Sequence, residues 1–239
     1  MICNQADIAK LGTILGVWAH PDDETFSMGG IMIAAVRNGQ TVACVTATRG
    51  EAGVQDPKRW PQKELGHIRT DELEASYKIM GVTHHTWLDY PDGGCKTSRT
   101  DDAVDCLVAL IHTYNPESIM TFGPDGLTGH DDHKTVSKWA DLAVKKAGSR
   151  AKIYHAIQTP QQYKNMLEVD KQFNLFFNID QPPLCEEDYC AIHFVLDDDT
   201  YHKKLEALKA MPSQYEAMLK VFEERLHASL ATEAFVRAD

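Results

Sequence analysis

Long apolar segments are missing from this chain of 239 residues. Stretches such as Ile14–Ala19 and Ile31–Val36 are far shorter than the roughly 20 apolar residues that a membrane-spanning helix needs. The first residues also lack a basic stretch, and Asp7 precedes the first apolar run, which is atypical of a signal peptide. We therefore expect a cytoplasmic protein without a membrane partner.

Basic residues are scarce as well. The chain has 24 Lys and Arg against 35 Asp and Glu, which gives a formal net charge of −11. An acidic surface of this kind lacks the positive footprint that contact with nucleic-acid phosphates or an anionic membrane requires. The expected partner is a small molecule, and nucleic acid is not expected.

Paired cysteine motifs and flexible linkers are absent too. The 6 cysteines show no CxxC spacing, which favours reduced, mostly packed thiols over a disulfide framework or a zinc knuckle. No Gly/Ser-rich linker, low-complexity tract or internal repeat divides the chain. We therefore predict a single domain over residues 1–239.

Short β-branched runs alternate with longer amphipathic ones from residue 13 to about 158. This alternation, with right-handed crossovers, is typical of an α/β fold, here a Rossmann-like three-layer sandwich with a mostly parallel sheet. The expected strands are 13–19, 41–47, 84–89, 118–123 and 152–158. The expected helices are 25–38, 62–80, 101–114 and 131–147.

The remainder, about 159–239, is less regular and is predicted to form a C-terminal α/β elaboration of the same domain. Residues 174–179 and 191–197 have the composition of strands. Residues 199–226 are expected to form one helix that is bent or interrupted at Met211-Pro212.

Histidines and carboxylates follow the first and fourth expected strands. Ala19-His20-Pro21-Asp22-Asp23-Glu24 comes after the first, and Gly123 to His133, ending in His130-Asp131-Asp132-His133, comes after the fourth. Ligands of an open parallel sheet bind at the carboxyl ends of its strands, so both segments are expected at one edge. Acidic oxygens repel phosphate, which excludes a dinucleotide fingerprint and favours a cation.

Zinc binds neutral imidazole and carboxylate, and a catalytic zinc site has three protein ligands with one position left for water. His20, Asp23 and His133 together offer such a set. Taken singly, each acidic segment could instead cap the helix that follows it. Two such clusters at one sheet edge are hard to explain as two independent caps, and the metal interpretation is therefore preferred.

The motifs AHPDDE and GHDDH make this chain similar to the PIG-L/LmbE-like family of zinc-dependent N-acetylglucosaminyl deacetylases. Three further segments resemble the same family and extend the likeness over about residues 13–140: TATRGEAG (46–53), IRTDELEASYKIMGV (68–82) and LDYPDGG (88–94).

The resemblance implies roles for individual residues. His20, Asp23 and His133 correspond to the ligands of one Zn²⁺ per chain, and Asp22 to the general base that takes a proton from the attacking water. His130 corresponds to the donor that stabilises the oxyanion. Asp132 is expected behind His130, accepting a hydrogen bond from the other ring nitrogen, which would hold the ring and favour its charged form.

Contacts to a sugar are implied for Arg69 and Asp92, and Glu51 follows the second strand at the same edge. Alternatives remain open for the first two: Arg69 could pair with a neighbouring carboxylate on a solvated face, and Asp92 could simply form a turn. Thr128 stands where the mycothiol branch of the family tends to carry a tyrosine, which leaves the substrate open.

The expected activity is hydrolysis of the N-acetyl group of an N-acetylglucosamine-type sugar or its conjugate, releasing acetate and an amine. One alternative is an amidase for a larger thiol conjugate or N-acyl amine, and another is a non-catalytic, metal-dependent sugar-binding domain. Two imidazoles and a carboxylate also accept iron(II), nickel or cobalt. The long segment 50–61 makes self-association into a homo-oligomer compatible with the sequence.

Overall fold

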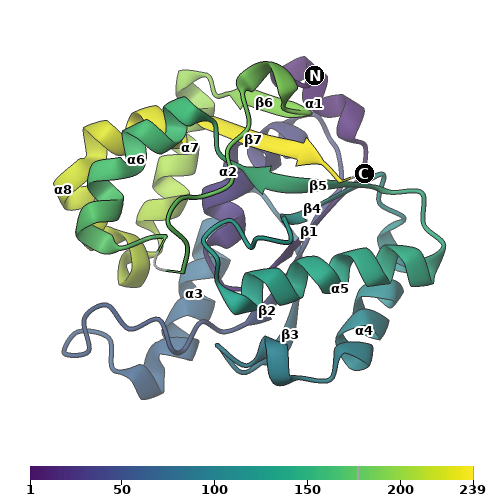
Figure 1. Cartoon of the computed structure of the whole chain (residues 1–239), viewed down its shortest axis with the longest axis horizontal. Coiled ribbons are helices and arrows are strands. Elements are labelled where there is room, and N and C mark those ends of the chain that lie inside the picture. Colours follow the sequence, from purple (N-terminus) through teal and green to yellow (C-terminus); the bar gives the residue numbers. More distant parts are fainter. Residues whose placement is uncertain (177, 239) are drawn as a thin grey trace.

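One seven-stranded sheet organises the computed structural model, which describes residues 1–176 and 178–238 without the side chains of 222–225 (Figure 1). The strand order is β3-β2-β1-β4-β5-β7-β6, and neighbours from β3 to β5 are parallel. This confirms the predicted α/β, Rossmann-like fold. Among the described residues, no helix is long and apolar enough to cross a membrane.

The five parallel strands lie where the sequence predicts them. Their bounds are β1 Ile14–Trp18, β2 Val42–Thr48, β3 His84–Tyr90, β4 Ser118–Phe122 and β5 Lys152–Ile157. Every residue of β1, β2 and β4 is buried. Strands covered on both faces read as continuous apolar runs, which is why these three are recognisable from the sequence.

Two strands of the C-terminal part extend the same sheet. β6 (Ile192–Val195) falls within a predicted strand, whereas the sequence analysis assigned no element to β7 (Thr232–Arg237). β7 runs antiparallel between β5 and β6, with Ala156 opposite Phe235. The last strand along the chain is therefore internal to the sheet.

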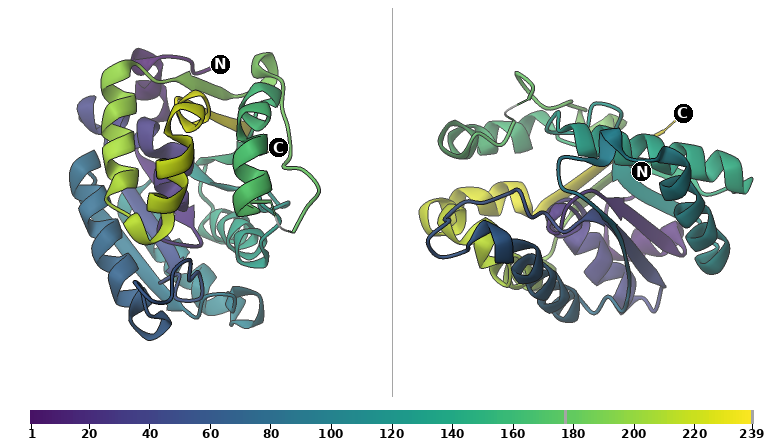
Figure 2. Two further views of the ribbon diagram at one scale, coloured as in Figure 1. Left: turned by 90° about the vertical axis from the view of Figure 1, so that its left-hand side faces the viewer. Right: turned by 90° about the horizontal axis from the view of Figure 1, so that it is seen from below.

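Helices cover both faces of the sheet (Figure 2). α2, α3 and α7 pack together on one face, α4 and α5 on the other, and α6 packs against α8. The helices are α1 Gln5–Ile8, α2 Asp23–Arg37, α3 Gln62–Met80, α4 Thr100–Tyr114, α5 Asp131–Ala147, α6 Pro160–Phe173, α7 Asp198–Lys209 and α8 Pro212–Leu230. Short 3₁₀ turns lie at Ala9–Leu11, Cys95–Thr97 and Glu187–Tyr189.

The predicted interruption at Met211-Pro212 is confirmed, because α7 ends at Lys209 and α8 begins at Pro212. The predicted strand 174–179 is wrong: its described residues form turns and bends, and residue 177 lies outside the described part of the chain. α6 was missed although its start is marked, since Thr159 and Gln162 form a reciprocal capping box around Pro160.

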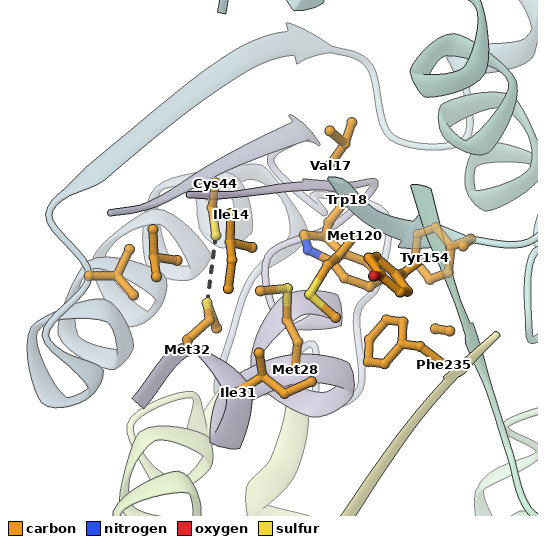
Figure 3. Close-up of a cluster of buried hydrophobic side chains, with 14 of the residues drawn as sticks. Ile14, Val17, Trp18, Met28, Ile31, Met32, Cys44, Met120, Tyr154 and Phe235 are labelled. Carbon is orange, nitrogen blue, oxygen red and sulfur yellow. Dashed lines mark hydrogen bonds between the residues drawn. The ribbon is translucent and has the colours of Figure 1, made fainter. Parts of the chain in front are cut away.

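The core beneath β1 is built from side chains of α2 and the central strands (Figure 3). Met28, Ile31 and Met32 of α2 are fully buried there, with Met32 Sδ 3.6 Å from Cys44 Sγ. Trp18, at the end of β1, is also fully buried and meets Phe122 edge to face at 4.9 Å. The carboxyl end of β1 therefore has a rigid base.

A buried ion pair fixes α2 near its middle. The helix loses helical geometry at Met28 (φ −139°, ψ 18°), and the amides of Gly30 and Ile31 donate to the Glu233 carboxylate of β7 at 2.7 Å each. Lys204 of α7 completes the cluster, with Nζ 2.6 Å from Glu233 Oε1. Both side chains of this pair are 1% exposed. β7 thereby positions the helix whose first turn carries Asp23.

Candidate metal centre and active site

Polar side chains from four strand ends meet at the carboxyl edge of the sheet. His20 follows β1, Glu51 follows β2 and Asp92 follows β3, while His130 and His133 come from the segment between β4 and α5 and from the first turn of α5. Parallel strands direct their carboxyl ends to one side, so the topology explains this convergence. The structure thus brings the two predicted clusters together.

The three predicted ligands surround one point. His20 Nδ1 lies 3.1 Å from His133 Nε2, and the Asp23 carboxylate spans the two rings, with Oδ2 3.5 Å from His20 Nδ1 and Oδ1 3.5 Å from His133 Nε2. Metal–ligand distances of about 2.0–2.2 Å in a tetrahedral site separate neighbouring ligand atoms by about 3.3–3.6 Å. The spacing of these atoms therefore fits a small divalent ion.

The outer nitrogens of both rings face acceptors. His133 Nδ1 lies 2.9 Å from the Gly126 carbonyl oxygen, and His20 Nε2 lies 3.0 Å from Asp92 Oδ1 and 3.5 Å from Asp132 Oδ2, at ion-pair distance rather than in an aligned hydrogen bond. Protons held on these outer nitrogens leave two lone pairs facing each other across 3.1 Å. A cation between the rings resolves that repulsion.

Charge around the cluster also favours a cation. Although burial alone would lower it, contacts with the carboxylates of Asp132, Asp23 and Asp92 hold the pKa of His20 well above its usual value. Burial instead lowers the pKa of His133 to about 4, so this ring stays neutral, as a metal ligand must be. The carboxylates that hold a proton on His20 would equally stabilise a metal ion in its place.

Asp22 lies between two of the candidate ligands in a strained conformation. Its φ of 144° is in the region that favours glycine, and such backbone persists only where its surroundings impose it. Arg69 supplies part of that support, since its Nη2 donates to the Pro21 carbonyl at 2.8 Å and lies 3.3 Å from Asp22 Oδ2. Burial, opposed by the Arg69 cation, raises the pKa of Asp22 to about 7.

His130 is the N-cap of α5, and its Nδ1 accepts the backbone N–H of Asp132 at 3.1 Å. Nε2 therefore carries the proton in the neutral ring and is the donor nitrogen. Burial lowers the pKa of His130, helped by the neighbouring charge on His20. The ring centroid lies 4.8 Å from that of His20 and 5.0 Å from that of His133, so this donor borders the candidate metal centre.

The Asp132 carboxylate binds the neighbouring loop, and the expectation that it accepts from the His130 ring is corrected, because His130 Nδ1 is itself the acceptor of the Asp132 N–H. Its two oxygens accept the backbone N–H groups of Gly93 at 2.7 Å and Cys95 at 3.0 Å, and Oδ2 also lies 3.5 Å from His20 Nε2. Asp132 is completely buried. It joins the loop after β3 to the loop after β1, a link for which the sequence offers no signal.

The three predicted substrate residues differ in position. Arg69 is 4% exposed, with Nη1 donating to the Gly50 carbonyl at 2.9 Å, and a side chain at Gly50 would collide with its guanidinium. Arg69 therefore does not form the solvated ion pair that its helix position allowed. Asp92 Oδ2 accepts the Ala52 N–H at 2.9 Å, and Glu51 Oε1 accepts the Asp92 N–H at 2.9 Å. Glu51 thus holds the backbone of Asp92 in place.

A solvent-open cleft of about 380 Å³ lies over the cluster. Arg69, Asp92, His130 and Thr128 line it, together with Gln214 of α8, which the sequence analysis did not single out. The loop between β2 and α3 closes one side of the cleft, because Gln55 Nε2 donates to the Gln214 carbonyl at 2.8 Å and Gln214 Nε2 to the Gly53 carbonyl at 3.3 Å. These polar groups suit a ligand rich in hydroxyls.

Fold and site together define a Rossmann-like α/β protein with histidines and carboxylates gathered at the carboxyl edge of its sheet, where His20, His130 and His133, or His20, Asp92 and Asp132, could hold a metal ion. The family model of PIG-L, described as GlcNAc-PI de-N-acetylase, matches residues 15–144, which is more than half of the chain. The chain therefore belongs to this family.

Individual relatives share the fold and part of the sequence. A 1D-myo-inositol 2-acetamido-2-deoxy-α-D-glucopyranoside deacetylase of Streptomyces avermitilis is 29% identical over 212 residues, covering 80% of this chain and 69% of the relative. The N,N′-diacetylchitobiose deacetylase of Pyrococcus horikoshii superposes with a TM-score of 0.63 at 22% identity, covering 95% and 83% of the two chains. The zinc-inhibited form of teicoplanin deacetylase Orf2 gives 0.66 at 14% identity, covering 95% and 99%.

Proposed function

We propose that this protein is a metal-dependent N-deacetylase that hydrolyses the acetamide of an N-acetylglucosamine-type sugar or conjugate, releasing acetate and a free amine. The observation that carries the proposal is the buried cluster of His20, Asp23 and His133, spaced for one divalent ion and flanked by the Asp22 carboxylate. Membership of the PIG-L family and the deacetylase activities by which the relatives are named support it.

His20, Asp23 and His133 would hold the ion, and two imidazoles with one carboxylate suit Zn²⁺. When bound, the ion polarises the amide carbonyl and acidifies water. Asp92 and Gly126 orient the two rings from outside, through the contacts to His20 Nε2 and His133 Nδ1.

Asp22 acts as the general base and removes a proton from the water that attacks the amide carbon. Its pKa, raised to about 7 by burial, lies near the operating pH, where a general base is most effective. The Arg69 guanidinium, 3.3 Å away, holds the carboxylate in place. The proton taken from water is then available for the departing amine.

His130 donates its Nε2–H to the oxyanion that forms as water adds to the carbonyl carbon. The Asp132 N–H, bonded to Nδ1, fixes the tautomer that this role needs. Donors aimed at a developing oxyanion contribute on the order of 3–4 kcal/mol. The N-cap position of His130 sets the ring orientation before substrate arrives.

The sugar lies in the polar cleft, where Arg69 and Asp92 border the candidate metal centre. Glu51 positions Asp92 through its backbone N–H. We also infer a cytoplasmic location, because all six cysteines are free thiols, as expected in a reducing compartment.

The decisive experiment separates metal binding from turnover. We expect Asp22→Asn and His130→Gln to retain the metal of the wild-type protein and to lower acetate release about 10²–10⁴-fold, because each removes a proton-transfer or oxyanion group. Elemental analysis and an acetate assay on N-acetylglucosamine conjugates give the two readouts.

Asp71→Asn is the matched control, because Asp71 is exposed on α3 and lies outside the cleft. Its turnover is expected within twofold of the wild type. An Asp22→Asn enzyme with more than a tenth of wild-type activity and full metal content contradicts the assigned base.

A further inference from the structure

A second, apolar pocket opens beside the candidate metal centre. It has a volume of about 130 Å³ and shares Asp22, Asp23, Thr128, His133 and Leu175 with the polar cleft. Apart from Ser27 and Gln158, its remaining walls are apolar and come mainly from α2, α6, the segment after α6, and α8. They include Phe26, Met166, Phe176, Tyr215 and Met218.

The two cavities therefore present different chemistry next to the same group of residues. The cleft offers charged and amide groups, among them Arg69, Asp92 and Gln214. The pocket offers aromatic and aliphatic surface, with the Phe26 and Tyr215 rings nearly parallel at 12° and 6.4 Å apart. Hydroxyls of a sugar lose their water contacts without replacement in such a pocket. With the sugar in the cleft, the pocket is the neighbouring space at Asp22, Asp23 and His133 that is left for the acyl side of the amide.

The pocket is larger than an acetyl group needs. An apolar cavity of about 150 Å³ accommodates benzene, so about 130 Å³ has room for a chain of several carbons. An acetyl group would place a single methyl there and leave most of the apolar wall uncovered. The walls gain contact only with a longer chain.

We propose that this pocket is an acyl-chain subsite, so that the enzyme hydrolyses, besides N-acetyl amino sugars, those whose acyl group is longer, of about four to six carbons. The inference rests on the proposed amide hydrolase function and adds the class of acyl group. The products are then a short-chain carboxylate and the same free amine, with one water consumed.

Gln158 limits the length of that chain. It is 7% exposed and lines both the acyl pocket and a smaller void of about 30 Å³ behind it. Its Oε1 has no hydrogen-bond partner within the described part of the chain. An aliphatic chain long enough to reach this oxygen offers it no hydrogen-bond donor and exceeds the space available. Turnover is therefore expected to fall for acyl chains longer than the pocket.

The test is a series of N-acylglucosamines with acyl groups of two, three, four, six and ten carbons, assayed by release of the amine. Each buried methylene is worth about a fourfold gain in binding at most. We expect kcat/KM for the butyryl compound to equal or exceed that for the acetyl compound, and to drop at least tenfold for the decanoyl compound. A butyryl value tenfold or more below the acetyl value overturns the subsite.

Two variants assign the effect to the pocket. Ser27→Leu extends a half-buried α2 side chain into it and is expected to lower the butyryl-to-acetyl ratio at least tenfold. Met218→Ala widens it and shifts the optimum to a longer chain. Met80→Ala, at a fully buried methionine at the end of α3 away from the pocket, is the matched control and keeps the wild-type ratio.

The outcomes are separable. Hydrolysis of the acetyl compound alone overturns only the acyl subsite, whereas no hydrolysis of any member contradicts the proposed function itself. A uniform loss in Ser27→Leu across all chain lengths also overturns the subsite. The subsite is also overturned if the turnover of alkyl N-acetylglucosaminides depends on the length of the alkyl aglycone, because that result would place the aglycone in the pocket. The wild-type series alone remains decisive if a variant does not fold.

Discussion

At the scale of single residues, Asp22 shows how strain and chemistry coincide. A non-glycine residue at a φ of 144° costs about 1–3 kcal/mol unless its surroundings compensate. Here the Phe26 N–H donates to the Asp22 carbonyl at 2.9 Å, and Arg69 holds Pro21. The turn thereby directs Asp22 and its neighbour Asp23 to different tasks, the former toward Arg69 and the latter toward the two imidazoles.

His85 predicts a pH dependence of stability outside the site. Burial, together with the Arg49 cation, lowers its pKa to about 4, against 6.5 for an unperturbed ring. Between pH 6.5 and 4, His85 is therefore protonated in the unfolded chain and neutral in the folded chain. The contribution of neutral His85 to the free energy of unfolding is fully present above pH 6.5, and about 3 kcal/mol is lost as the pH falls through this window.

His85→Gln should remove that part of the pH dependence while retaining a polar partner for Thr46 Oγ1, now 2.9 Å from His85 Nε2. Urea unfolding at pH 7, 5.5 and 4.5 measures the difference from wild type. His84→Gln, at the exposed neighbouring position, is the control. Parallel pH profiles for wild type and His85→Gln would contradict the assignment.

The sequence indicates the candidate metal ligands more clearly than the groups that support them. His20, Asp23 and His133 are recognisable because they follow strand ends that a parallel sheet brings to one edge. The contacts of Asp132 with Gly93 and Cys95, and of Asp92 with His20, depend on how three loops fold against one another. No periodicity or spacing encodes such contacts, so these partners emerge only in three dimensions.

At the scale of secondary-structure elements, the Lys204–Glu233 pair makes α2, α7 and β7 interdependent. We expect Lys204→Met to destabilise the protein by about 3 kcal/mol, since it leaves a buried carboxylate without its cation. Adding Glu233→Gln should recover part of the loss, because the amide still accepts a backbone N–H without a charge. Urea unfolding measures all three proteins.

Lys171→Ala provides the comparison with an exposed pair. Lys171 lies 2.7 Å from Glu168 on α6, and its side chain is 69% exposed. Exposed pairs of this kind typically contribute about 0–1 kcal/mol. A loss in Lys204→Met as small as that in Lys171→Ala would show that α2 does not depend on the buried pair.

Elements differed in how far the sequence could predict them. The central strands β1, β2 and β4 were identifiable from short, buried apolar runs, and helices α2 to α5 from amphipathic spacing. The run 174–179 is equally apolar, but its described residues form turns and bends, and Leu175 and Phe176 line the apolar pocket instead of pairing with a neighbouring strand. Strand composition indicates burial, and only tertiary structure decides what covers the side chain.

At the scale of the whole molecule, a metal ion should stabilise the chain. A ligand that binds only the folded state at about 100 times its dissociation constant adds about 3 kcal/mol. For a chain of 239 residues this corresponds to a rise in Tm of about 5–10 °C. Scanning calorimetry of chelator-treated protein, before and after addition of Zn²⁺, measures the change.

His20→Ala is the control for that experiment, because it removes one of the two imidazoles that would hold the ion. Its Tm is expected to be insensitive to Zn²⁺. If wild type and His20→Ala respond equally, the ion binds elsewhere on this acidic chain, whose net charge of −11 attracts cations generally.

The internal position of β7 has a consequence for biosynthesis. Glu233, which receives the amides of α2, is translated about two hundred residues after Gly30 and Ile31, at a separation of 203 and 202 positions. While the chain is still on the ribosome, α2 is made but lacks this acceptor, and β5 lacks its antiparallel neighbour. Assembly of the hydrolytic centre is thus completed only after β7 leaves the exit tunnel, so activity waits for a segment made about two hundred residues after α2.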